Sequence, residues 1–293
     1  MKIVSQAIIA LLLLVAPAHA HMLWVNAFES FAHKPGHTTV SIGWGHSLPI
    51  DDITNSVNAR TVVKDFSLTD PAGKVLSLHI PASKVTKPFA KTVDVGIFDA
   101  DTACQKIAFN KNTTPGTYLA AAKTEIKSYT RYIDSKGRTR LALKPQNEVK
   151  DIEKVLFSVQ YQAFAKSYFS VEKWISPKPI GHGLEITPLT DLSKVKVGDL
   201  VEVDVRFLGK PLSYGPTGIE YVTAFSPSFG QGKGFELFSY ISEGKAQFEV
   251  QSVGQWVVNV FHNEPVTKDG PLKDLYGKVT SVNYGATLTF TAK

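Results

Sequence analysis

The sequence predicts an all-β protein made of two immunoglobulin-like β-sandwich domains, the first with a helical insertion. Runs rich in Val, Thr, Phe and Tyr recur along the chain, Gly- and Pro-containing turns separate them, and only residues 145–169 show helical spacing. The Pro- and Gly-rich segment 176–183 separates a predicted N-terminal domain, residues 21–175, from a predicted C-terminal domain, residues 183–293.

The first twenty residues have the three parts of a secretory signal peptide. Lys2 is the basic n-region, residues 7–16 form an apolar run too short to span a bilayer, and Ala18 and Ala20 supply small side chains before a cleavage site. We expect cleavage after Ala20, which leaves His21 as the first residue of a periplasmic protein with no stable membrane insertion. Cleavage after Ala18 is the alternative, and it leaves histidines at positions one and three.

The N-terminal half begins with predicted strands at residues 38–45, 63–80 and 116–126. Within the second of these, the turn sequence DPAGK joins two alternating runs and predicts a β-hairpin. Residues 145–169 follow, and we predict one helix or two short ones there. The apolar residues of this segment fall roughly on one helical stripe: Val149, Ile152, Val155, Leu156, Val159 and Phe164.

The C-terminal half contains predicted strands at residues 199–212, 221–227, 246–263 and 285–292. We count roughly seven short strands in about 110 residues, which matches an immunoglobulin-like sandwich in size and turn spacing.

Charge and cysteine content limit the choice of partners. The chain has 32 Lys and Arg against 26 Asp and Glu, and the basic residues are spread among acidic ones. A dispersed charge of this size is typical of a solvated surface, so we expect no nucleic-acid partner. The single cysteine, Cys104, cannot form an internal disulfide, and we expect it to be buried and inert.

Histidines gather near the predicted mature N-terminus, where four lie between residues 21 and 46. Neutral imidazole is the commonest metal ligand in proteins. The mature chain contains no HExxH, CxxC, GxSxG, GxGxxG or P-loop motif, so nothing in the sequence indicates a hydrolase triad or a nucleotide site.

As a first residue, His21 would carry both a free α-amine and an imidazole, which together close a chelate ring on one metal ion. Both groups lose a proton at little cost near neutral pH. Nitrogen-rich ligand sets suit Cu(II) or Ni(II). His46 is the expected partner, because Gly43 and Gly45 let its loop bend and Pro49 fixes the exit of the chain.

Two further histidines could complete the ligand set. His262 follows a predicted strand at its end, and His37 lies next to a KPG turn. Solvated or structural roles are the simpler interpretation for the remaining ones: His33, His79 and His182.

Four stretches of the chain resemble the DUF4198 family: AHAHMLWVN, GWGHSLPIDD, LEITPLTDLSKVKVGDLVEVDVRFLGKPL and GQWVVNVFH. Proteins of that family are exported and β-rich, and they are described as periplasmic components of cobalt or nickel uptake, similar to the nickel-transport subunit NikM. The resemblance implies that nickel is held near the mature N-terminus, where His21 matches the junction histidine and His46 the glycine-flanked histidine. The chain differs from NikM in lacking a membrane anchor and in placing its terminal histidine first rather than second.

These observations predict an exported periplasmic metal-binding protein that is not an enzyme. It would capture Ni(II) or Co(II), with Cu(II) as a further option, for metal uptake, and a membrane metal-transport complex could receive the ion. Trp24 and Trp44 would shield the metal or simply pack in the core or at its edge, and the Asp51–Asp52 pair would form a solvated turn, add an oxygen ligand or favour the approach of cations.

Two other functions stay open. A copper-dependent oxidase-like enzyme would use the terminal histidine and a second one as a histidine brace, although such enzymes usually carry disulfides and this chain has one cysteine. A metal-free module would bind glycans or proteins through its sandwich loops, and His21→Ala would then leave its function unchanged.

Overall fold

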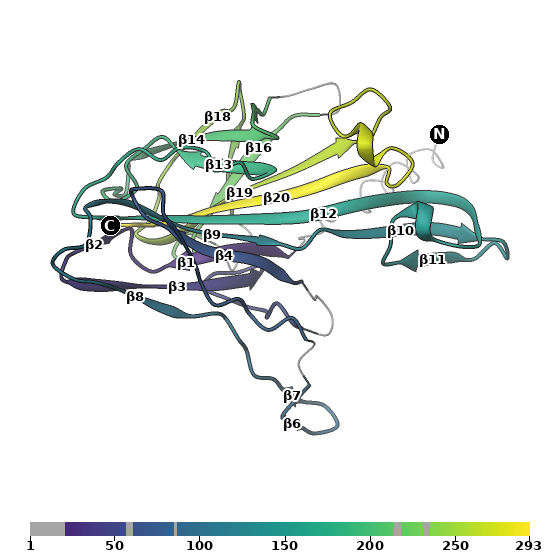
Figure 1. Ribbon diagram of the computed structural model, residues 1–293, viewed down its shortest axis with the longest axis horizontal. Helices are drawn as coiled ribbons and strands as arrows, with labels where there is room; N and C mark the ends of the chain where they lie inside the picture. The colour runs from purple at the N-terminus through teal and green to yellow at the C-terminus, as the bar shows by residue number, and fades with distance from the viewer. Residues whose placement is uncertain (1–20, 57–60, 85–86, 214–217, 231–234) are drawn as a thin grey trace, which may run out of the picture.

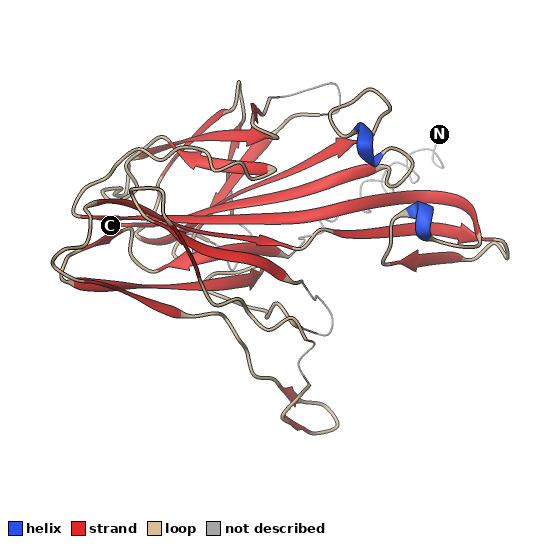
Figure 2. Cartoon of the chain, in the orientation of Figure 1, coloured by secondary structure: helices blue, strands red, loops and turns tan. Residues whose placement is uncertain are grey.

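The computed structural model describes residues 21–293 except 57–60, 85–86, 214–217 and 231–234. The predicted signal peptide, residues 1–20, lies outside the described residues. The described part is all-β, as predicted, and its helical elements are two short 3₁₀ turns, η1 (Gln146–Glu148) and η3 (Lys273–Leu275) (Figure 2). Neither helical turn in this part of the chain has the length and apolarity that a membrane crossing needs.

A large sheet forms the middle layer of the molecule, and a smaller sheet packs on each of its faces (Figure 1). Its main path runs in the order β17 (Leu237–Tyr240), β16 (Tyr221–Phe225), β19 (Gly254–Pro265), β20 (Ser281–Ala292), β12 (Ile152–Val171), β9 (Gly116–Thr124), β4 (Val63–Thr69) and β5 (Val75–Ser77). Three further strands join through β12: β2 (Phe31–Ala32), β10 (Lys127–Asp134) and β11 (Thr139–Ala142).

The smaller sheets are antiparallel. One consists of β1 (Met22–Ala27), β3 (Gly36–Gly45) and β8 (Gln105–Phe109), and the other of β13 (Leu184–Pro188), β14 (Leu200–Phe207), β15 (Lys210–Pro211) and β18 (Lys245–Glu249). A short hairpin of β6 (Ala90–Lys91) and β7 (Gly96–Ile97) projects from the body (Figure 1). We call the face of the large sheet under β1 the N-terminal face, and the face under β14 the C-terminal face.

The predicted helical insertion at residues 145–169 is wrong, because most of this segment belongs to the twenty-residue strand β12. Both faces of β12 are covered along its second half: Phe164 and Tyr168 join the core of the C-terminal face, and Ala165 and Phe169 that of the N-terminal face. In the first half of β12, register shifts against β10 interrupt the two-residue alternation that identifies strands, and in the second half burial on both faces removes it. Chance spacing of the apolar residues then imitates a helical stripe. The DPAGK hairpin prediction is confirmed, since Thr69 pairs with Val75 across β4 and β5.

The two halves of the chain share the large sheet. The predicted linker, residues 176–183, has no regular strand and leads from β12 to β13. However, β12 pairs in parallel with β20, the last strand, from Val159–Ser281 to Ser167–Thr289. The hydrogen-bonded ladder therefore runs without interruption from the first half of the chain into the second.

Strand β1 lies on the N-terminal face along β20. The Thr287 hydroxyl donates to the carbonyl of Leu23 at 2.7 Å, and the Thr289 hydroxyl donates to that of Val25. These buried hydrogen bonds fix the N-terminal strand on the large sheet and so position the residue just before it, His21.

Candidate metal centre

Pairing between β1 and β3 brings the two leading histidines together. Met22 pairs with Gly45 at the end of the ladder, so the residue before Met22 and the residue after Gly45 leave the sheet side by side. These residues are His21 and His46, whose ring centroids lie 4.2 Å apart with the ring planes tilted by 53°. Twenty-four residues separate them in the chain, and the hairpin-like register of the two strands removes that separation.

Two carboxylates support the histidine pair. Asp52 Oδ2 lies 2.9 Å from Nε2 of His21, and Asp51 Oδ2 lies 3.5 Å from Nδ1 of His46. Asp51 Oδ1 also accepts the backbone N–H groups of His46 at 2.7 Å and Ser47 at 3.1 Å. The tight turn after β3 is thus closed by the same side chain that approaches the imidazole of His46.

Glycines permit this close packing. A side chain at Gly45, whose φ is +129°, would place its Cβ 1.9 Å from Asp51 Oδ1. A side chain at Gly43 would overlap the indole of Trp24. Trp24 is buried under the loop and donates to the carbonyl of Pro49, and Trp44 stacks against the His21 ring at 5.4 Å between centroids.

The carboxylates orient the rings in the manner of metal-ligating histidines. A ligating imidazole commonly directs its second nitrogen to a carboxylate, which fixes the ring and raises its basicity. Asp52 engages Nε2 of His21, so Nδ1 is the nitrogen that can chelate together with an α-amine on the same residue. Within the described residues no three His, Cys, Asp or Glu side chains converge as a metal cluster. The His21–His46 pair and its two carboxylates therefore do not form such a cluster by themselves.

The structure does not bring His37 or His262 to this pair. His37 is exposed near the start of β3, eight residues and roughly 25 Å of strand before Gly45. Side chains alternate between the two faces along β19, and this alternation places His262 on the C-terminal face, against Phe207. His21 lies on the other face of the large sheet, so the sheet itself stands between the two histidines.

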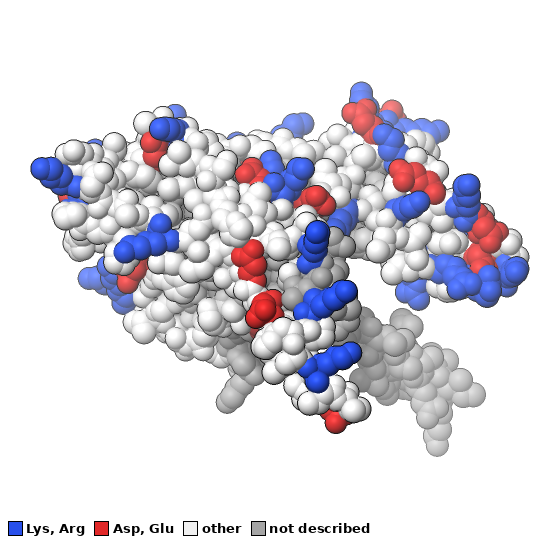
Figure 3. Space-filling view, turned by 60° about the horizontal axis from the view of Figure 1, so that its bottom comes forward, with Lys and Arg blue, Asp and Glu red and all other residues white. Residues whose placement is uncertain are grey.

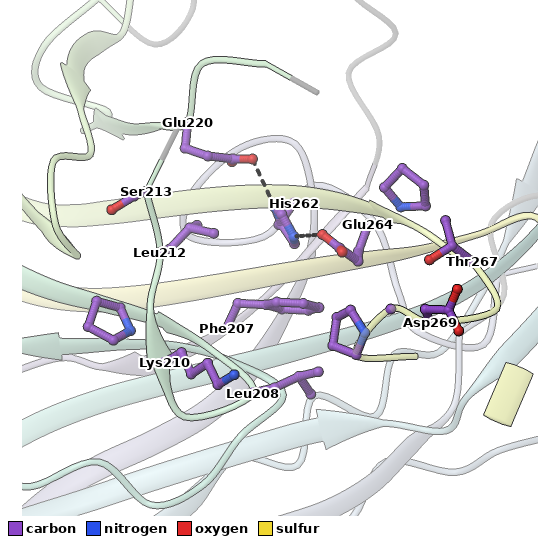
Figure 4. Close-up of a pocket in the computed structure, with 14 residues that line it drawn as sticks. Phe207, Leu208, Lys210, Leu212, Ser213, Glu220, His262, Glu264, Thr267 and Asp269 are labelled. Atoms are coloured by element: carbon purple, nitrogen blue, oxygen red, sulfur yellow. Dashed lines mark hydrogen bonds and ion pairs between the residues drawn. The ribbon is translucent and has the colours of Figure 1, made fainter. Parts of the chain in front are cut away.

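His262 instead lies in a pocket of about 820 Å³ on the C-terminal face (Figure 4). Its Nδ1 is 2.9 Å from Glu220 Oε1 and its Nε2 is 3.2 Å from Glu264 Oε2. The carboxylates approach opposite nitrogens of one ring and do not converge on a common point, so they tie β19 to the residue before β16 and do not form a chelating set. Pro211, Thr267 and Asp269 also line the pocket.

Cys104 is exposed, contrary to the expectation of burial. It follows Ala103, which takes the buried position beside β8 and is 1% exposed.

Charged side chains of both signs are interspersed over the surface in the view of Figure 3. A cluster of basic side chains lies near the β10–β11 hairpin.

Two carboxylate contacts of the structure have only weak signals in the sequence. The sequence offers a solvated turn or an oxygen ligand at Asp51–Asp52, and in the structure these carboxylates contact the imidazoles of His21 and His46. Glu220, which contacts His262 and not the histidine pair, is marked in the sequence only by its place immediately before a predicted strand.

The fold and the site define a class of protein. It is an all-β chain with a central sheet and a pair of histidines at the end of its N-terminal strand. The chain belongs to the family described as "Domain of unknown function (DUF4198)", which it matches over residues 18–264. A comparison with curated proteins finds no match.

Solved structures show only distant similarity. An α2-macroglobulin variant from Salmonella matches with 11% identity over 93% of this chain and 15% of its own, at a TM-score of 0.22. A DUF4785 family protein from Legionella pneumophila matches with 10% identity over 92% of this chain and 56% of its own, also at 0.22. Murine CEACAM1b matches with 9% identity over 92% and 98% of the chains, at 0.18.

Proposed function

We propose that this protein is an exported, periplasmic metal-binding protein that captures Ni(II), Co(II) or Cu(II) at its mature N-terminus. The observation that carries the proposal is the contact between His21 and His46, each with a carboxylate near one ring nitrogen. Cleavage after Ala20 would add an α-amine on His21, and the amine and Nδ1 of one residue would then chelate a single ion. An imidazole of His46 would supply a third nitrogen, and such nitrogen-rich sets suit late divalent transition metals.

We further propose a role in metal uptake, which this arrangement and the family resemblance support. A site at the edge of the molecule, formed by a chain end and one loop, can exchange its ion with a partner, and a membrane metal-transport complex would be that partner. Asp51 and Asp52 add negative charge next to the site, which favours the approach of cations.

We propose that the scaffold of this site includes an immunoglobulin-like C-terminal half. Strands β13, β14 and β18 face β17, β16, β19 and β20, and this strand order supports the proposal because it is the order of the A-B-E and C′-C-F-G sheets of such sandwiches. The N-terminal half would be the second, less regular sandwich of the proposal.

Calorimetry with tag-free mature protein tests the proposed function. We expect about one Ni(II) or Cu(II) ion per chain, and we expect one extra residue before His21 to weaken binding at least about tenfold, because it removes the α-amine from the chelate ring. His46→Ala should weaken binding to a similar degree.

The matched control is His79→Ala. His79 is an exposed histidine paired with Asp101 at 3.0 Å, so this variant also removes a histidine–carboxylate contact, but one between the segment after β5 and the segment before β8. It should bind the metal as the wild type does. Equal affinity of the extended and native N-termini would rule out the amine as a ligand.

A further inference from the structure

Beside the histidine pair, the large sheet carries an exposed aromatic surface on its N-terminal face. We call Tyr221, Phe238, Tyr240 and Phe261 the aromatic surface. Phe238 and Tyr240 are 67% and 74% exposed, which is unusual for side chains inside a strand. Tyr221 pairs with Tyr240 across β16 and β17, and its ring centroid is 5.6 Å from that of Phe238.

The alternation of the strands shows that these rings share one face. Val222 and Ala224 belong to the core of the C-terminal face, so Tyr221 and Thr223 point to the opposite face. Thr223 pairs with both Phe238 and Asn259, which places those residues there too. Phe261 lies two residues beyond Asn259 on β19 and therefore has the same orientation.

The surface is continuous with the histidine pair. Phe225 and Val257, on the same face, pack directly against Trp24 and Leu48, which flank the two histidines in the sequence. The hydroxyls of Thr287 and Thr289 donate to the carbonyls of Leu23 and Val25, so β1 and β20 lie side by side and run in the same direction. By the same spacing, His21 lies two residues before Leu23 and is therefore beside Gly285, which pairs with Phe261 on β19.

No charged side chain of the described residues points to this face from β16, β17, β19 or β20. The residues that accompany the rings there are hydroxyl and amide side chains: Thr223, Asn259, Asn263, Ser281 and Asn283. On the C-terminal face the same strand β19 presents His262 and Glu264 instead. The lack of charge disfavours a nucleic acid, an anionic lipid surface or a charged peptide as the occupant.

We propose that the aromatic surface binds a neutral glycan. The flat faces of sugar rings carry C–H hydrogens with partial positive charge, which match the negative faces of Phe and Tyr rings. The sugar hydroxyls at the rim both donate and accept hydrogen bonds, as do the amides and hydroxyls beside the rings. The glycan would lie along β16 and β17 and lead toward His21 and His46. Its binding requires no metal.

Depletion assays with metal-free mature protein test this proposal. The probes are insoluble cellulose, chitin and starch. We expect binding to at least one of them, and we expect Phe238→Ala and Tyr240→Ala each to raise the dissociation constant at least about tenfold, since each removes one stacking ring. Phe89→Ala is the matched control, because Phe89 is also 67% exposed but lies next to the projecting β6 strand.

His21→Ala separates this proposal from the metal-binding function. It should lose metal binding and keep glycan binding. Failure of all three polysaccharides to deplete the protein would overturn the glycan proposal, as would unchanged binding by Phe238→Ala and Tyr240→Ala. A wild-type dimer that both variants convert to monomers in sedimentation would assign the surface to a second copy of the chain and also overturn it.

Discussion

At His21 a single hydrogen bond determines which nitrogen can take part in a chelate. Asp52 engages Nε2, and the ring is held further by stacking on Trp44. Loss of a carboxylate that orients a ligating histidine typically costs 10–100-fold in metal affinity, because the ring loses its fixed orientation and some basicity.

Asp52→Asn should therefore weaken Ni(II) or Cu(II) binding by about tenfold or more, measured by competition with a chelator of known affinity. The amide keeps the shape of the side chain, so the fold should be unaffected. Asp101→Asn, which changes the partner of His79, is the control and should leave the affinity unaltered. Identical affinity of Asp52→Asn and wild type would exclude an orienting role for Asp52.

A second histidine responds to pH in a way that follows from its burial. Burial, reinforced by the nearby Lys166 ammonium, lowers the pKa of His182 to about 3. Lys166 itself forms an ion pair with Glu185 between β12 and β13, and burial lowers the pKa of Lys166 to about 8 despite that partner. The His182 ring packs on Phe164 in this region, and the protonated form is disfavoured there.

The unfolded chain binds a proton at His182 near its ordinary pKa of about 6.5, whereas the folded chain does not until about pH 3. The free energy of unfolding should thus fall as the pH drops below about 6.5, by about 2 kcal/mol between pH 7 and pH 5 from this residue. Urea titrations of wild type and His182→Gln at both pH values measure the effect. The variant should lose less stability, and an equal loss in both proteins would contradict the assignment.

At the scale of elements, the alternation of β19 separates two roles. Its odd-numbered residues reach the N-terminal face, where the histidine pair lies, and His262 reaches the C-terminal face. Glu220 and Glu264 hold the His262 ring from both sides and connect β19 to the start of β16.

His262→Ala should therefore leave metal stoichiometry and affinity unchanged while lowering the free energy of unfolding by about 2 kcal/mol or more. The loss arises because two carboxylates remain facing a buried position without their partner. Calorimetric titration and urea unfolding of the same preparation give both quantities. A large loss of metal affinity at unchanged stability would place His262 in the metal site after all.

Over the whole molecule, the shared sheet decides how the chain unfolds. Strand β12 contributes Phe169 to the core of the N-terminal face, and β20 contributes Phe290 to that of the C-terminal face, while the two strands pair with each other. Complete unfolding of either half therefore removes one strand of the parallel ladder and takes a pairing partner from the other half.

We expect a single thermal transition, reported alike by near-ultraviolet circular dichroism and calorimetry. Phe169→Ala and Phe290→Ala, one in each core, should each lower the free energy of unfolding by about 3–5 kcal/mol and shift the same transition. Two transitions, each moved by only one of the variants, would indicate halves that unfold independently.

The amino-acid sequence by itself determined the all-β class, the β4–β5 hairpin and the family. It also selected His21 and His46 as a candidate pair of metal ligands. These depend on local signals: two-residue alternation, the turn residues of DPAGK, and histidines beside glycines. Each of these signals lies within a short stretch of the chain, so it can be recognised before the fold is known.

Only the tertiary structure decided that residues 152–171 form a central strand, that the two halves share one sheet, and that His262 lies on the opposite face from His21. Each of these depends on pairing between distant segments and on which face of a strand is covered. A strand covered on both sides carries no periodic signal, and a histidine at a strand end does not reveal which face it will take.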